Sequence, residues 1–418
     1  MNKTKIPQKC GVFCSIWIKL LLKFWRLCFI IILFVGINMN NRKFWKKYNK
    51  KIEFQISELL KNKAKNNEED VLCDLHMHSN HSTDGKQTLQ DIIEESIKYG
   101  FEIISITDHD SVSVYDDLYK MIKTHALPQN APIIIPGIEH TVSFKDYKTM
   151  CHILKYFVNP KSKAINGDIK KLNKSYYNRA KIQISRILQS SFYQSIFSQY
   201  KIKVTYKDFL RFLKKNHTIP DYAPLVDYLA TKFNQAGLKT KELYRLVREY
   251  NDNDACLERQ RLKNERFAYL DNKYQNIDVQ DNRRFMLSIL GVRGVDDAYF
   301  PEYPVSGSIS VDEYGQVSIY NLNKQGITVF AHPEHEKVNL IGKVKNCAGG
   351  FWGLELNFKS KQEFFDELLV VANNQNLCVT KGSDRHKKDE PVYDDLSFYK
   401  IKTKVLQSLI EEKQKRKI

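Results

Sequence analysis

The stretch Val71-Leu72-Cys73-Asp74-Leu75-His76-Met77-His78 joins an apolar run, which is typical of a buried β-strand, to two histidines. Because side chains alternate along a strand, His76 and His78 are predicted to project from the same side of the strand end. Two imidazoles held in this way are a common start for a metal site.

The residues that follow repeat this arrangement. A helix is predicted at residues 88–99, with Thr88 as its N-cap and Gly100 as its stop. A second strand, at residues 102–107, then leads into Asp108-His109-Asp110. Strands that alternate with helices and end in ionisable residues are typical of a β/α barrel, so the sequence predicts an α/β fold of this kind.

Four later segments also place ionisable residues at or near strand ends. They are the strands at 133–135, 150–157, 327–330 and 379–380. A lone histidine is most often a surface or core residue, and Asp-Gly is most often a turn. A whole set at strand ends is not expected from scatter, and it predicts nine N/O ligands: His76, His78, Asp84, His109, Glu139, His152, His332, Asp384 and His386.

Taken in order, these motifs closely resemble the polymerase and histidinol phosphatase (PHP) superfamily over residues 71–160 and 326–390. The resemblance implies a distorted (β/α)7 barrel that binds two or three divalent metal ions at its C-terminal face, with the nine residues above as ligands. One difference is the turn Ser82-Thr83-Asp84-Gly85, which is one residue longer than the Ser-Asp-Gly of many members. The resemblance implies catalytic roles for His76, His78, His109, Glu139 and Asp384.

The ligand types indicate the metal and the chemistry. Imidazole and carboxylate without thiolate suit Mn, Zn or Fe better than Mg or Ca. Such ions lower the pKa of bound water from 15.7 towards ~7 and neutralise charge on phosphoryl oxygens. The expected function is therefore hydrolysis of a phosphate ester of a nucleotide or small phosphorylated molecule. The alternatives are a 5′–3′ exonuclease on short RNA or DNA, a histidinol-phosphatase-like enzyme, or a membrane-tethered metal-binding module without catalysis.

Residues 161–324 separate barrel segments 70–160 and 325–400, and they are predicted to form a mainly helical, basic insert; a further helix is expected at 401–418. Of the net charge of +18, residues 161–217 contribute 14 basic and 2 acidic side chains. Such a patch suits anionic partners, or it is simply a solvated face. Arg179, followed by Ala180 and Arg186, resembles a helix in relatives that hydrolyse 3′,5′-nucleoside bisphosphates or trim RNA 5′ ends. This resemblance implies that Arg179 binds a substrate phosphate; the alternative is an exposed helix arginine.

The first 69 residues form an apolar and basic extension, with 15 basic and 4 acidic side chains. An interrupted apolar run at 12–37 precedes a basic run at 42–51 that includes Phe44, Trp45 and Tyr48. Residues 12–51 are therefore predicted to associate with the cytoplasmic side of a membrane. The alternative is that translation starts at Met39. The eight scattered cysteines, without a Cys-x-x-Cys pair, indicate reduced thiols and a cytoplasmic location.

Overall fold

The computed structural model describes residues 41–144, 149–216, 218–220, 222–238, 242–243, 245–246, 249, 315–333, 338, 341–342, 350–358, 362–388 and 390–418. The apolar run at 12–37, which carries part of the predicted membrane segment, lies outside them. Within the described ranges, no helix has the length and apolar character needed to cross a membrane.

Eight strands form one mixed sheet in the order β7-β6-β5-β4-β3-β2-β1-β8. The strands that pair antiparallel are β1 with β8, β3 with β4, and β4 with β5, whereas the other neighbours are parallel. The strands are β1 Asp70–Met77, β2 Ile103–Ile106, β3 Ile133–Phe144, β4 Thr149–Tyr156, β5 Ile327–Phe330, β6 Phe351–Asn357, β7 Cys378–Gly382 and β8 Lys400–Lys402.

The sheet curls into a nearly closed barrel because the ends of β1 and β7 meet. The amide of His78 donates to the carbonyl of Arg385 at 2.8 Å, and the amide of Asp384 donates to the carbonyl of His76 at 2.8 Å. Strands β1 to β7 thus form the wall of the barrel, and β8 pairs with β1 outside this ring. The predicted distorted α/β barrel is confirmed, and its distortion comes from the reversed strand β4 and the added strand β8.

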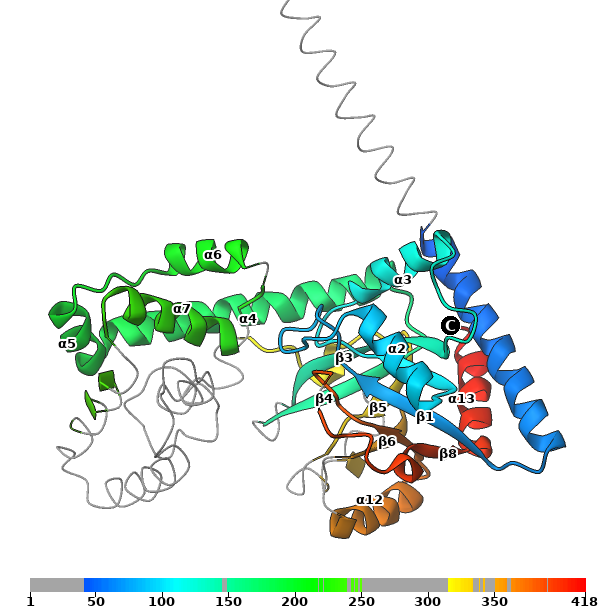
Figure 1. Cartoon of the computed structure of the whole chain (residues 1–418). Helices are drawn as coiled ribbons and strands as arrows, with labels where there is room; N and C mark the ends of the chain where they lie inside the picture. Colours follow the sequence, from blue (N-terminus) through cyan, green and yellow to red (C-terminus); the bar gives the residue numbers. More distant parts are fainter. Residues whose placement is uncertain are drawn as a thin grey trace, which may run out of the picture.

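Helices cover the outside of the barrel (Figure 1). Helix α2 begins after Thr88, whose side chain accepts from the amide of Asp91, and ends at Gly100, which has a φ of 75°. These are the N-cap and the stop that the sequence predicted. The helices on the barrel are α2 Leu89–Tyr99, α3 Val114–Lys123, α12 Gln362–Asn374 and α13 Thr403–Arg416, with short 3-10 turns η2 Ile319–Asn321 and η5 Leu396–Tyr399.

Residues 41–65 form a helix that packs against the barrel beside α13 (Figure 1). Trp45 is fully buried, and the Tyr48 hydroxyl donates to the carbonyl of Ile134 at 3.2 Å. From the sequence, these two aromatic residues were expected to lie in a segment that associates with a membrane, but they belong to the barrel core. The basic side chains at the start of this helix face solvent: Arg42, Lys43, Lys46, Lys47, Lys50 and Lys51 are all exposed.

The insert starts with the long helix α4, Lys163–Gln189, which extends from the barrel to an arm of shorter helices (Figure 1). These are α5 Ser191–Gln199, α6 Tyr206–Lys215 and α7 Tyr222–Gln235. They pack around an apolar core of their own, which includes Ile184, Phe209 and Leu229. Helix α4 thus contacts both the barrel and the arm.

Candidate metal centre

The nine predicted ligands come together at one end of the barrel. Strand β1 carries His76 next to its last residue and leads to His78, strand β3 carries Glu139, and strand β4 carries His152. The remaining residues lie in the connections that follow the strands. The nine side chains form three overlapping groups in which the ligand atoms of each group lie within 4.8 Å of one another: His78, Asp84, His109 and His386; His76, Glu139, His332 and Asp384; and His109, Glu139 and His152.

Glu139 occupies the middle of the cluster and is fully buried. One of its oxygens, Oε2, lies 3.1–3.2 Å from nitrogens of His76, His78 and His109. The other, Oε1, lies 3.0 Å from both His152 Nδ1 and His332 Nε2. A carboxylate in this position can bridge neighbouring cations through its two oxygens.

The close approach of imidazole nitrogens to one another indicates that the residues fit metal ions. His76 Nε2 lies 3.1 Å from His78 Nε2, and His152 Nδ1 lies 3.2 Å from His332 Nε2. Two neutral imidazoles form one hydrogen bond at most, whereas several lone pairs that point at a common centre suit a cation. The donor set is nitrogen and oxygen without sulfur, which fits divalent Mn, Zn or Fe.

The cluster is strongly polarised when it holds no metal. Burial alone would raise the pKa of Glu139, but His76, His109 and His152 hold that pKa well below its usual range. Burial would lower the pKa of His78, but Asp384 and Glu139 raise it to about 10. The carboxylates also raise the pKa values of His76 and His332, so protons on these three imidazoles balance the carboxylates, a role that bound cations would take over.

Two of the ligand residues have unusual backbone conformations. His332 has a φ of 23° and Asp384 a φ of 51°, both on the left-handed side where residues other than glycine are uncommon. Hydrogen bonds hold these residues in place, since the amide of His332 donates to Glu355 at 2.8 Å and that of Asp384 donates to the carbonyl of His76 at 2.8 Å. Strain of this kind is characteristic of functional sites.

Glu355 is a site residue that the sequence analysis missed. It lies in β6 and is fully buried, with its oxygens 2.8 and 3.0 Å from His76 Nδ1. A carboxylate on the far nitrogen of a ligand histidine fixes the tautomer and orientation of the ring. The available signal was a single carboxylate within the apolar run Phe351-Trp352-Gly353-Leu354, which no motif marks.

Two further buried carboxylates hold the loops that carry the ligands. Asp108 accepts from the amide and the hydroxyl of Ser79 at 2.6 and 2.7 Å. Asp74 accepts from the amide of Ser383 at 3.0 Å and from the Tyr393 hydroxyl at 2.8 Å. Both residues belong to quoted motifs, but the sequence alone gave them no role.

Gly382, at the end of β7, lies directly against the site. A Cβ at this position would lie 2.3 Å from the Cβ of His76 and 2.5 Å from Glu355 Oε1. No side chain fits at such distances, so this residue must be glycine for His76 and Glu355 to keep their positions.

Asp84 and His386 lie at the outer side of the cluster. Asp84 Oδ2 is 3.2 Å from His386 Nε2 and 3.7 Å from His109 Nε2, so the longer turn still brings this carboxylate to the ligand group. Its side chain is 44% exposed, more than that of any other residue of the set.

A cavity of about 340 Å³ lies beside His109, between the barrel and the insert. Helix α4 contributes Asn166, Ile169 and Asn173 to its wall. The other residues that line it are Asn80, His81, Ser82, Thr83, His109, Asp110, Ser111, Val112, Ser113, Thr218 and Ile219.

Arg179 does not line this cavity. It is only 3% exposed, and its guanidinium lies 5.1 Å from the centre of the Tyr176 ring. The Tyr176 hydroxyl in turn donates to Asp110 at 2.5 Å. The alternative of an exposed helix arginine is therefore wrong, whereas phosphate binding by Arg179 stays a prediction.

Two of the known structures that resemble this chain show low similarity to it. One is a proposed metal-dependent phosphoesterase from Bifidobacterium adolescentis, with 19% identity, a TM-score of 0.40, and coverage of 76% of this chain and 89% of that chain. The other is an amidohydrolase from Chromobacterium violaceum with bound sulfate and no metal, with 16% identity, a TM-score of 0.38, and coverage of 80% and 98%. Likenesses of this size do not bear on the activity of this chain.

Comparison with curated protein sequences gives no significant match. Residues 74–261, in contrast, match the family model of the PHP domain. The match includes the ligands on β1, β3 and β4 and the first helices of the insert, and the later ligands His332, Asp384 and His386 complete the same cluster. The chain therefore carries a PHP domain.

Proposed function

We propose that the chain is a metal-dependent phosphoesterase that hydrolyses a phosphate ester of a nucleotide or small phosphorylated molecule. The PHP domain and the His/Asp/Glu clusters support a metal-dependent hydrolase. The phosphate ester as substrate is the further step that we propose.

This proposal rests on a difference in solvent exposure within the cluster. We call its fully buried residues the floor and its partly exposed residues the rim. His76, His78 and Glu139 are fully buried, whereas the side chains of His109, His152, His332, Asp384 and His386 are 16–30% exposed. Structural metal sites are closed, and catalytic ones keep a position open for water or substrate. The partly exposed rim, next to a cavity, therefore favours catalysis over a purely structural metal site.

Each of the three ligand groups would hold one ion. One ion would be held by His76, Glu139, His332 and Asp384, and a second by His78, Asp84, His109 and His386, with His152 next to a third position shared with Glu139 and His109. Bound divalent ions supply Lewis acidity, which activates water and neutralises phosphoryl oxygens. Glu355 and Asp108 keep the ligands oriented before substrate binds.

The direct test is hydrolysis of p-nitrophenyl phosphate by metal-stripped protein to which Mn²⁺, Zn²⁺ or Fe²⁺ is added back. We expect activity to return with metal and to be abolished by Asp384→Asn, with Asp394→Asn as the control for a carboxylate on the surface. Stoichiometric metal uptake without hydrolysis of any phosphate ester would favour the metal-binding module without catalysis.

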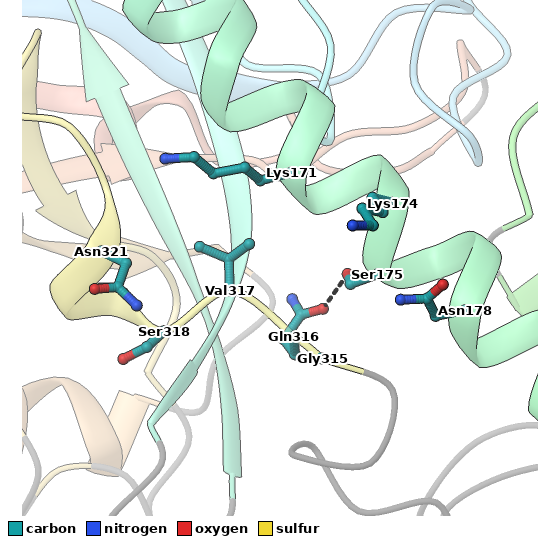
Figure 2. Close-up of a pocket in the computed structure, with 9 residues that line it drawn as sticks. All are labelled: Lys171, Lys174, Ser175, Asn178, Gly315, Gln316, Val317, Ser318 and Asn321. Carbon is teal, nitrogen blue, oxygen red and sulfur yellow. Dashed lines mark hydrogen bonds between the residues drawn. The ribbon is translucent and has the colours of Figure 1, made fainter.

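A second candidate function is 5′–3′ trimming of short RNA or DNA, and the lysines of α4 favour it. Lys170 and Lys174 line a cavity of about 500 Å³ that shares Asn166, Ile169 and Asn173 with the cavity beside His109. Figure 2 shows Lys171 and Lys174 on α4 facing the segment 315–321 across a further cavity of about 630 Å³, and none of the described residues that line it is acidic. This run of cations could hold a phosphate backbone.

Salt dependence separates this candidate from the first. Binding of an oligonucleotide along α4 should weaken steeply with salt, because each phosphate contact releases counterions. We expect Lys170→Ala with Lys174→Ala to impair an oligonucleotide but not a mononucleotide, and Lys163→Ala with Lys181→Ala to impair neither. A flat salt response would argue against the nuclease.

We also propose that the exposed basic face of helix 41–65 contacts anionic lipid headgroups. The six cationic side chains within residues 42–51, listed above, are all exposed. Clusters of this size attract acidic membranes by about 1 kcal/mol for each Lys or Arg near the surface. Sedimentation with phosphatidylserine vesicles should exceed that with neutral vesicles and fall with added salt; equal sedimentation with both would contradict the proposal.

A further inference from the structure

Hydrolysis of a phosphate ester leaves an alkoxide unless the departing oxygen receives a proton. The cavity beside His109 is the space next to the metal cluster where the organic part of a substrate would lie. The 14 described residues that line it include three with titratable side chains, namely His81, His109 and Asp110.

Two of these three are already engaged. His109 belongs to two of the ligand groups. Asp110 is 2% exposed, and its oxygens lie 3.1 Å from His140 Nδ1 and 2.5 Å from the Tyr176 hydroxyl. Among the described residues that line the cavity, His81 is thus the one titratable group that is neither a predicted ligand nor buried in such a network.

His81 is held in the way that a general acid requires. Its Nε2 is 2.8 Å from Asp117 Oδ2, and its own amide donates to Ser79 Oγ at 3.1 Å. Ser79 is in turn bound by the buried carboxylate of Asp108, so the loop is fixed to the floor of the metal cluster. The carboxylate of Asp117 on one ring nitrogen sets the tautomer and orientation of the imidazole.

The surroundings of the pair keep it accessible. The His81 side chain is 29% exposed and that of Asp117 is 41% exposed. Lys120, one turn further along α3, donates to the other oxygen of Asp117 at 3.0 Å. Asp117 therefore bridges a surface lysine and the cavity histidine.

We propose that His81, positioned by Asp117, is the general acid that protonates the leaving oxygen. This inference rests on the proposed phosphoesterase activity. As water adds to phosphorus, the P–O bond to the organic group breaks and its electron pair goes to the departing oxygen. That oxygen takes a proton from Nδ1 of protonated His81, so an alcohol leaves. The neutral imidazole then regains a proton from solvent, while the proton released by the attacking water balances the equation.

A series of leaving groups tests the proposal. Esters of weakly basic alcohols, such as p-nitrophenyl phosphate, leave without protonation, whereas an alkyl ester such as glycerol phosphate needs it. General acid catalysis contributes roughly 10²–10⁴-fold. We therefore expect His81→Asn to lower kcat for glycerol phosphate by about 10²-fold or more, and that for p-nitrophenyl phosphate by less than about tenfold. Asp117→Asn should act in the same direction with a smaller loss.

Two controls separate this role from a structural one. His125→Asn replaces an exposed histidine at the end of α3 and should change neither rate. The metal content of His81→Asn should equal that of the unaltered protein. Equal losses on both esters, or no loss on either, would overturn the assignment of His81 while leaving the phosphoesterase intact. If the unaltered, metal-loaded protein hydrolyses neither ester, the phosphoesterase fails and this inference falls with it.

Discussion

Substitution of Glu355 by glutamine should weaken metal binding although it hardly changes the size of the side chain. Two groups form hydrogen bonds with the carboxylate. They are His76 Nδ1, at 2.8 and 3.0 Å from its oxygens, and the amide of His332, at 2.8 Å. Glutamine offers one carbonyl oxygen, so its NH2 group must face one of these two donors. An unsatisfied buried donor costs about 1–3 kcal/mol.

The loss should appear mainly in the affinity for metal, because both affected residues are predicted ligands. Removing the carboxylate partner of a ligand histidine typically lowers metal affinity about 10–100-fold. That range corresponds to about 1.4–2.7 kcal/mol, which agrees with the cost of one unsatisfied donor.

Calorimetric titration of metal-free protein with Mn²⁺ measures this affinity. Glu94→Gln is the matched control, since Glu94 is exposed on α2 and remote from the ligands. The proposed role of Glu355 is wrong if the affinity of Glu355→Gln for Mn²⁺ is within about twofold of that of the unaltered protein and the two proteins melt at the same temperature.

Substitutions at three further sites, Gly382, Trp45 and Lys155, test the packing and the buried charge of the barrel. Gly382→Ala should prevent metal binding, because its Cβ would lie 2.3 Å from that of a ligand histidine, whereas Gly167→Ala on α4 meets nothing within 4 Å and should stabilise by about 0.5–1 kcal/mol; thermal melts with and without Mn²⁺ check both. Trp45→Ala should lower the free energy of unfolding by about 3–5 kcal/mol, against less than about 0.5 kcal/mol for the 65%-exposed Phe54→Ala. Denaturant titration would contradict the packing of this helix if the two losses were alike. Lys155 is fully buried, and burial lowers its pKa from 10.5 to about 8. The unfolded chain therefore binds more protons between these values, and the stability of the protein relative to Lys155→Met should rise by about 1–3 kcal/mol from pH 7 to pH 10; a constant difference would contradict the burial of the charge.

The barrel and the convergence of the ligands were accessible from the sequence for a simple reason. Apolar strands and their ionisable ends are local patterns, and a barrel brings the ends of its strands to common places. His76 and Glu139 lie 63 residues apart in the chain, yet each could be placed from its own strand. The capping residues Thr88 and Gly100 gave the bounds of α2 by equally local chemistry.

Other features depend on tertiary contacts that no local pattern reveals. Glu355 looks like an isolated carboxylate in an apolar strand, and only the folded barrel shows that it reaches His76 on β1. Trp45 and Tyr48 next to lysines fit a membrane interface and a packed amphipathic helix equally well in sequence. The role of His81 depends on Asp117, a residue of helix α3 that no motif connects to it.

Anomalous X-ray diffraction from crystals grown with Mn²⁺ is the most direct test of whether the ligand cluster binds metal ions. We expect two or three strong peaks around Glu139, each within bonding distance of the nitrogens and oxygens of one of the three ligand groups. Absence of anomalous density at the barrel mouth, or manganese bound only at surface carboxylates, would contradict the metal centre and the hydrolase built on it.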